Sequence, residues 1–164
     1  MIFVTVGTGQ QPFDRLLRAV ESFSSDGDVV VQCGSSVVRP TGAVSVDFIP
    51  FSELVARMTE ARIVITHAGV GSVLTALSVE KRPYVVPRRR RYREAVDDHQ
   101  VELARRLAGA GLVTLVEDTR DLQSALERDE ARLAALPLAD ADSPLNRELR
   151  SYLASCCEPT AATA

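Results

Sequence analysis

Short, mostly apolar segments recur along the chain, and each is followed by a glycine, a proline or a polar stretch. They occupy residues 2–6, 28–33, 44–49, 63–66, 84–86 and 112–116. Apolar residues at consecutive rather than alternate positions indicate strands that are buried on both faces. We therefore expect these segments to form a sheet that is covered on both sides.

The stretches between these segments show helical periodicity. An amphipathic helix with i, i+3, i+4, i+7 spacing is expected from Phe13, Leu16, Leu17, Val20 and Phe23. Further helices are expected from Ser52 as N-cap, at 72–79, at 94–108, from Thr119 and at 145–155.

Strands alternate with helices, which predicts an α/β fold with a doubly wound, Rossmann-like parallel sheet. Residues 1–142 are assigned to this domain. Residues 143–164 are expected to form a C-terminal helix and tail, a candidate docking element for a partner.

Composition narrows the class of protein. A chain of 164 residues with 46% hydrophobic and 25% charged residues suits one globular domain. The net charge of −3 argues against nucleic acid as the main partner. No apolar run approaches the ~20 residues of a membrane span, and the first residues lack the features of a signal peptide. The three cysteines form no metal-ligand set, so a reduced, cytoplasmic protein without bound metal is expected.

Two glycine-containing loops follow strands of the predicted sheet. Gly7-Thr8-Gly9 follows the first strand, and His67-Ala68-Gly69-Val70-Gly71-Ser72 follows the fourth. Ligands of open parallel sheets bind beyond the carboxyl ends of the strands. Without a Cβ, the glycines allow main-chain N–H groups to approach a ligand, and the start of a helix favours an anion. The loops thus predict a diphosphate site, to which Ser72 adds a hydroxyl and His67 an imidazole N–H.

Other interpretations of these loops remain open. The glycines would also allow tight packing of helix on sheet, with Ser72 as a simple N-cap and His67 as a hydrogen-bonded loop residue. A nicotinamide dinucleotide site fits less well, because Pro12 stands where the third glycine of GxGxxG is required.

A third candidate segment is VPRRRRYREAVDDHQ, residues 86–100. It begins with arginines 88–91 at the mouth of a strand and ends with Asp97, Asp98, His99 and Gln100. Asp, His and Gln side chains offer the acceptors and donors that sugar hydroxyls require. The alternative interpretation is a solvated helix face preceded by a solubilising cluster of arginines.

Together, GTGQQPFDRLL at 7–17, THAGVGS at 66–72 and VPRRRRYREAVDDHQ at 86–100 resemble the glycosyltransferase family 28 C-terminal domain. The resemblance covers residues 1–115 and is strongest to soluble subunits of two-chain enzymes in exopolysaccharide, capsule and dolichol-pathway synthesis. It implies the donor-binding half of an inverting GT-B enzyme that transfers a sugar from a UDP-sugar to a lipid-linked acceptor. It also implies a membrane-anchored partner subunit that recruits the cytoplasmic chain, and neither cofactor nor metal.

The resemblance also implies roles for individual residues. Those facing the diphosphate are Gly7, Thr8, His67, Gly69, Val70, Gly71 and Ser72. Those near the donor sugar are Asp98, His99 and Gln100, with the uracil near residues 48–51. Arg88 is a further candidate for substrate binding. The histidines His67 and His99 are the candidates for a catalytic base.

Two departures from the family pattern are visible, and one alternative function stays open. Gly9 and Gln10 stand where many relatives have His-Glu, and Thr75 replaces a glutamate that often binds the ribose. The alternative function is a UDP-sugar-binding module that regulates or scaffolds and does not catalyse transfer.

Overall fold

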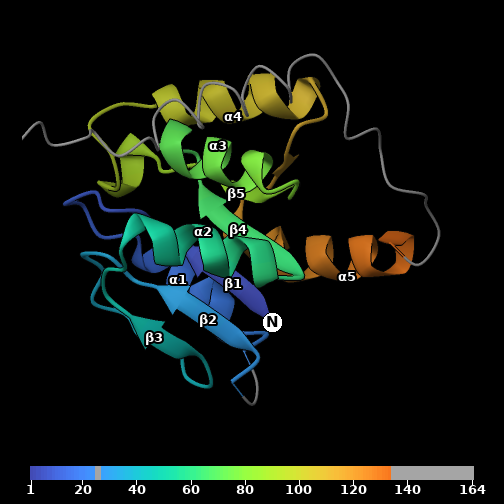
Figure 1. Cartoon of the computed structure of the whole chain (residues 1–164). Helices are drawn as coiled ribbons and strands as arrows, with labels where there is room; N and C mark the ends of the chain where they lie inside the picture. Colours follow the sequence, from blue (N-terminus) through green and yellow to red (C-terminus); the bar gives the residue numbers. More distant parts are fainter. Residues whose placement is uncertain (25–26, 134–164) are drawn as a thin grey trace, which may run out of the picture.

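The computed structural model describes residues 1–24 and 27–133, and within them six parallel strands form a single sheet (Figure 1). The strands are β1 (Ile2–Thr5), β2 (Val29–Gln32), β3 (Val44–Val46), β4 (Ile63–His67), β5 (Tyr84–Val86) and β6 (Thr114–Leu115). Their order is β3-β2-β1-β4-β5-β6. Every adjacent pair is parallel, so the predicted doubly wound α/β fold is confirmed.

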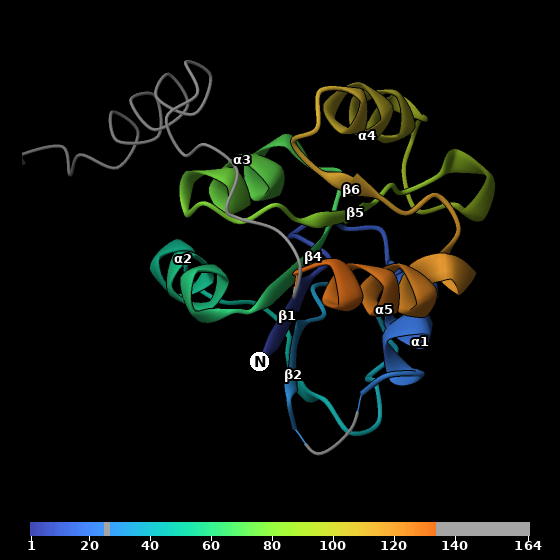
Figure 2. The same ribbon diagram turned by 90° about the vertical axis from the view of Figure 1, so that its right-hand side faces the viewer.

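Helices cover both faces of the sheet. They are α1 (Asp14–Glu21), α2 (Phe51–Glu60), α3 (Val70–Ser78), α4 (His99–Gly109) and α5 (Leu122–Leu133), with 3₁₀ turns η1 (Arg90–Tyr92) and η2 (Thr119–Asp121). Helices α1 and α5 pack on one face, whereas α2, α3 and α4 pack on the other. Figure 2 shows α2 and α3 on the side of the sheet opposite α1 and α5. No helix of the described residues has the length and apolar content to cross a membrane.

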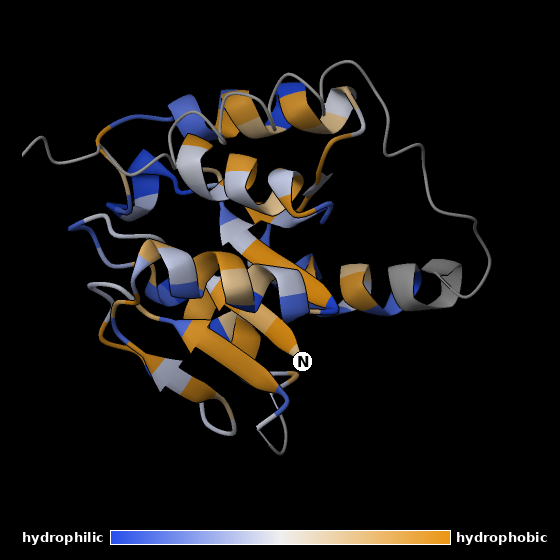
Figure 3. Cartoon of the chain, in the orientation of Figure 1, coloured by the Kyte–Doolittle hydropathy of each residue, from blue (hydrophilic) through white to orange (hydrophobic). Residues whose placement is uncertain are grey.

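The core explains why the strands are apolar at consecutive positions. Val4 faces the cluster formed with α1 and α5, whereas its neighbour Phe3 faces the cluster formed with α2 and α3. Both side chains have no exposed surface. Most of β2 and the first part of β4 are therefore orange in Figure 3.

The chain changes direction across the sheet between β1 and β4. From β1 it proceeds to β2 and β3 at one edge, then returns to β4 beside β1 and proceeds to β5 and β6. The loops after β1 and β4 therefore meet at the topological switch point, where ligands of this class of fold bind. Both loops lie at the carboxyl edge of the sheet, on the left in Figure 1.

Helix α4 begins at His99, so the predicted start at residue 94 is wrong. Arg93 ends η1 in a left-handed conformation with φ of 59°. The Glu94 side chain turns into the protein and accepts two hydrogen bonds from Arg15 of α1. This tertiary contact outweighs the helical periodicity of the segment.

Other predicted boundaries shift by a few residues. Pro50, rather than Ser52, is the N-cap of α2. Gly69 is the N-cap of α3, so Ser72 lies within the first turn of that helix and the simple N-cap interpretation is wrong. The 3₁₀ turn η2 separates Thr119 from α5. The predicted helix at 145–155 and the assigned segment 143–164 lie outside the described residues.

Candidate functional site

Three loops that follow adjacent strands form the candidate site. They comprise residues 6–12 after β1, residues 68–69 between β4 and α3, and residues 87–98 after β5. Because β1, β4 and β5 are neighbours in the sheet, these loops lie side by side at its carboxyl edge. The sequence places its three motifs in these loops and in the helix turns that follow them.

The His67 ring is packed between two glycines. A Cβ added at Gly7 would lie 2.4 Å from Cε1 of His67, and one added at Gly69 would lie 2.2 Å from its Nε2. Gly7 also has a left-handed backbone with φ of 76°. These two glycines are therefore required by the imidazole, in addition to any approach of a ligand.

We expect Gly69→Ala to destabilise the protein by about 1–3 kcal/mol, because the new methyl group forces the His67 ring to move. The backbone of Gly69, with φ of −75° and ψ of 131°, suits alanine, so the clash is the cause. In a His67→Ala protein the same substitution should be nearly neutral. A double-mutant cycle by urea unfolding measures this coupling, and additive effects would show that the ring and Gly69 do not interact.

The environment of His67 keeps its imidazole neutral at pH 7. Burial, followed by the positive charge of Arg88, lowers the pKa of His67 to about 4, although a hydrogen bond with the Thr5 backbone opposes this shift. A neutral imidazole has one N–H donor and one acceptor nitrogen. A hydrogen bond that raises the pKa of a histidine is one that its N–H donates, so the Thr5 backbone takes the single N–H of His67. The other ring nitrogen is then an acceptor.

The lowered pKa of His67 predicts a loss of stability in acid. Between about pH 6.5 and pH 4 the unfolded chain binds a proton at His67 that the folded protein does not, so the free energy of unfolding falls as the pH falls. The contribution of this residue is about 2–3 kcal/mol over that window. Urea unfolding at several pH values should show a shallower decline for His67→Gln than for the wild type. Equal declines would contradict a ring that is neutral in the folded protein.

The start of α3 presents main-chain donors at the open edge. The first N–H groups of a helix have no acceptor within it, and in α3 these belong to Val70, Gly71 and Ser72. Val70 is 58% exposed, and a Cβ added at Gly71 would meet no atom within 4 Å. Thr75, the residue in place of the ribose-binding glutamate, is buried and donates its hydroxyl to the Gly71 carbonyl at 2.8 Å. The turn can thus accept an anion at Gly71.

The four arginines of residues 88–91 have different environments, so they do not form one surface patch. Arg88 is 4% exposed, and Arg89 forms an ion pair with Glu117 at 2.9 Å. Arg90 and Arg91 are exposed, and the Arg91 guanidinium lies 4.7 Å from the centre of the Tyr92 ring.

The polar residues at the start of α4 lie at the same edge. Asp98 is exposed, and its Oδ1 accepts from the Arg90 N–H at 3.0 Å. The Gln100 Oε1 accepts from the Arg88 N–H at 3.2 Å. The side chain of His99 is 81% exposed and its Nδ1 lies 3.7 Å from Asp97 Oδ1. Within the described residues no group of three or more His, Cys, Asp or Glu side chains is arranged to hold a metal ion.

Comparison with known sequences shows the family of this chain. The sequence model of the glycosyltransferase family 28 C-terminal domain matches residues 1–147. The chain belongs to this family.

Relatives of this family 28 domain are longer chains. Over 123 residues it is 32% identical to the "UDP-N-acetylglucosamine transferase subunit ALG13" of Yarrowia lipolytica, an alignment that covers 65% of this chain and 60% of that protein. The calicheamicin glycosyltransferase CalG4 has a similar fold, with a TM-score of 0.57, 22% identity and coverage of 92% of this chain but 37% of its own. The glycosyltransferase of kitacinnamycin has a TM-score of 0.54 and 18% identity, with coverage of 94% of this chain and 40% of its own.

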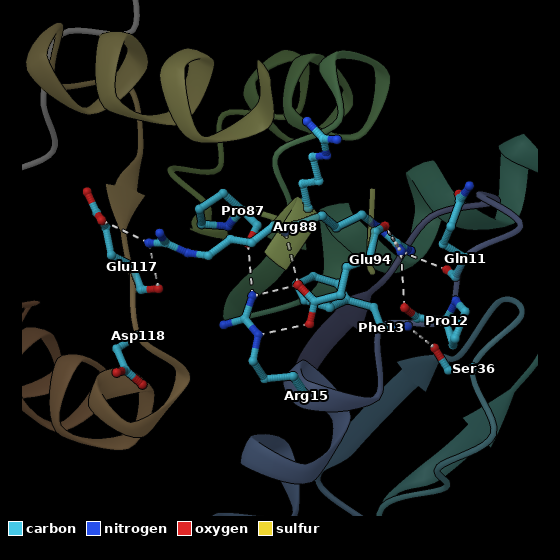
Figure 4. Close-up of polar contacts among 12 residues, drawn as sticks. Gln11, Pro12, Phe13, Arg15, Ser36, Pro87, Arg88, Glu94, Glu117 and Asp118 are labelled. Carbon is cyan, nitrogen blue, oxygen red and sulfur yellow. Dashed lines mark hydrogen bonds and ion pairs between the residues drawn. The ribbon is translucent and has the colours of Figure 1, made fainter. Parts of the chain in front are cut away.

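A buried charge network in the family 28 domain was not predicted from the sequence. The Glu94 carboxylate accepts from Arg15 Nε and Nη2, each at 2.9 Å, and from the Arg89 N–H at 3.1 Å (Figure 4). Arg15 also donates to the Pro87 carbonyl at 3.0 Å. The sequence feature that could have indicated it is a single glutamate, Glu94, directly after five arginines at 88–91 and 93. This network anchors the loop at 87–98 to α1.

Proposed function

We propose that this family 28 domain is the donor-binding half of an inverting, UDP-sugar-dependent glycosyltransferase in polysaccharide biosynthesis. It acts with a membrane-anchored partner subunit, and the acceptor is lipid-linked. The observation that supports this most is the open first turn of α3 at Gly71, at the switch point of a family 28 fold. The similarity to a UDP-N-acetylglucosamine transferase subunit supports the same donor class.

The proposed chemistry is a single displacement. The acceptor hydroxyl gives its proton to a general base and attacks the anomeric carbon. The bond from that carbon to the diphosphate oxygen breaks, and its electron pair leaves with UDP. The N–H groups of Val70, Gly71 and Ser72 stabilise the charge that develops on the diphosphate. In this proposal the chain uses neither a metal ion nor a cofactor.

Asp98 and Gln100 offer the donor sugar complementary hydrogen bonds. Because Gln100 Oε1 accepts from the Arg88 N–H, its Nε2 is the end available to donate. Because Asp98 Oδ1 accepts from the Arg90 N–H, its second oxygen is available to accept. One acceptor at the N-cap of α4 and one donor in its first turn suit sugar hydroxyls. His99, exposed at the start of α4, lies between them in the sequence.

A partner subunit is proposed because the Yarrowia relative is itself a subunit of a transferase. This chain covers 60% of the Yarrowia protein and about two fifths of the two solved glycosyltransferases. We propose that the partner binds the lipid-linked acceptor, supplies the general base and recruits this cytoplasmic chain to the membrane. A protein that lacks residues 143–164 tests the predicted docking element, because it should no longer co-purify with the partner.

A titration with UDP tests the donor site directly. We expect the backbone amide signals of Val70, Gly71 and Ser72 to shift on addition of UDP in a ¹H–¹⁵N NMR spectrum, whereas NAD should leave them unchanged. Unmoved signals at saturating UDP would overturn the proposal. Transfer from a UDP-sugar in the reconstituted complex then separates the enzyme from the non-catalytic alternative, which binds without turnover.

A further inference from the structure

The Arg88 side chain lies beneath the candidate site. It is 4% exposed, although Arg90 and Arg91 of the same run are exposed. Figure 4 shows it pointing toward the loop of Gln11 and Pro12. Its guanidinium lies 4.8 Å from the centre of the Phe13 ring, which stacks beneath it. This orientation places the charge inside the protein.

The hydrogen bonds of Arg88 join two loops. In the loop after β1, its Nη2 donates to the Val6 carbonyl at 2.8 Å and its Nη1 to the Gln11 carbonyl at 2.7 Å. In the loop after β5, Nη1 donates to the Glu94 carbonyl at 3.0 Å. The Pro12 carbonyl lies at the limit of hydrogen-bond distance, 3.5 Å from Nη1.

The partners of this guanidinium within the described residues are main-chain carbonyls rather than carboxylates. The Glu94 carboxylate bonds to Arg15, and only its main-chain oxygen bonds to Arg88. Val6 and Gln11 stand at the two ends of the loop that contains Gly7, Thr8 and Gly9. A planar guanidinium spreads its fixed donors over two terminal nitrogens and so holds both ends at once, whereas the three donors of a lysine ammonium leave from one nitrogen.

The main chain of Arg88 contributes a further contact. Its N–H donates to Gln100 Oε1, which orients the amide proposed to face the sugar. Side chain and backbone of one residue therefore contact the loop after β1, the loop after β5 and the first turn of α4.

We propose that Arg88 is a positioning residue that fixes the loop of residues 6–12 against the loop of residues 87–98, so that both hold the geometry required for the donor. It acts through these loops and does not contact the donor. The inference rests on the proposed function for the identity of the ligand, but the coupling of the two loops is independent of it.

The first arm of the test uses the ligand-free protein. Arg88→Lys keeps the positive charge and loses the two terminal nitrogens of the guanidinium. Arg91→Lys is the matched control at an exposed position. The amides of Val6 and Gly7 are hydrogen-bonded, to Gln32 and Thr5. We expect their hydrogen exchange to be at least tenfold faster in Arg88→Lys, and unchanged in Arg91→Lys. Unchanged exchange in Arg88→Lys would overturn the proposal, whatever the protein binds.

The second arm uses the wild-type protein, so it does not depend on whether a variant folds. We expect the side-chain N–H signals of Arg88 to be visible in the free protein and to keep their positions at saturating UDP, while the amides of residues 70–72 shift. Movement of the Arg88 side-chain signals beyond that of other buried N–H groups would indicate direct contact with the diphosphate and overturn the positioning role. Unmoved amides at 70–72 would refute the proposed function, and the first arm would still decide the coupling of the loops.

The third arm measures binding by calorimetry. We expect about tenfold weaker binding of UDP to Arg88→Lys, because binding must then order a loop that the wild type holds in place. The pKa of His67 provides the spectroscopic signature, since the Arg88 charge lowers it. It should stay low in Arg88→Lys and rise in Arg88→Met. Wild-type affinity in Arg88→Lys would contradict the proposal.

Discussion

Gly71→Ala is expected to fold as stably as the wild type and to lose UDP binding and transfer activity. The new Cβ meets no protein atom within 4 Å, and alanine is up to about 1 kcal/mol better than glycine in a helix. The fold therefore accommodates the methyl group without a clash. In the proposed complex, however, the methyl group occupies the space through which the main-chain N–H groups of α3 reach the diphosphate.

The expected loss for Gly71→Ala is about 10²–10³-fold in kcat/KM, comparable to removal of one donor to a developing oxyanion. Gly71→Val, with a larger side chain, should lose more. Calorimetry with UDP and initial rates of the reconstituted complex measure the effect, and urea unfolding measures stability.

Gly109→Ala is the matched control for Gly71→Ala. Gly109 is also helical, and a Cβ there also meets nothing within 4 Å, but it lies at the far end of α4. It should keep wild-type binding. Wild-type affinity for UDP in Gly71→Ala would remove the first turn of α3 from the donor site.

Arg15→Met is expected to lower the free energy of unfolding by about 3–5 kcal/mol. The substitution leaves the Glu94 carboxylate, which is 5% exposed, without its bidentate partner. A buried charge without a partner is strongly unfavourable, whereas a neutral pair of similar volume is tolerated. The double variant Arg15→Met with Glu94→Gln should therefore recover much of the lost stability, because the Gln side chain can still accept from the Arg89 N–H.

The exposed pair Arg120–Asp118 provides the control for Arg15→Met. Its nitrogen and oxygen lie 2.6 Å apart, but the Arg120 side chain is 87% exposed. Arg120→Met should leave the free energy of unfolding nearly unchanged, because water and salt screen the pair. Urea denaturation followed by circular dichroism measures all of these variants. A similar loss for Arg120→Met and Arg15→Met would show that burial of Glu94 is not the cause.

The two predictions concern residues at different places relative to the candidate site. Gly71 lies at the open edge, where a ligand is proposed to bind. Glu94 and Arg15 lie behind it and hold the loop at 87–98 in a non-helical conformation. If Arg15→Met loses stability but its folded molecules keep their affinity for UDP, the role of Arg15 is in the fold. Gly71→Ala is expected to keep its stability and lose affinity for UDP.

Much of the fold could be predicted from local patterns. Apolar residues at consecutive positions in segments such as 63–66 identified strands buried on both faces, and their alternation with helical periodicity predicted the parallel, doubly wound sheet. Parallel strands place their carboxyl ends at one edge, so the positions of the three candidate loops also followed from the sequence. The roles of the candidate site residues stay predictions that the proposed experiments test.

Contacts between distant segments decided the rest. The sequence showed glycines at 7 and 69 but not that a histidine ring fills the space between them. It showed a run of arginines but not that Arg88 turns inward to carbonyls as far as 82 positions away. Helical periodicity placed Glu94 in a helix, whereas its ion pair with Arg15, 79 positions earlier, excludes it from one. Secondary structure follows from neighbours within a few residues, but the side of the chain to which a charged group turns depends on which partners packing brings within reach.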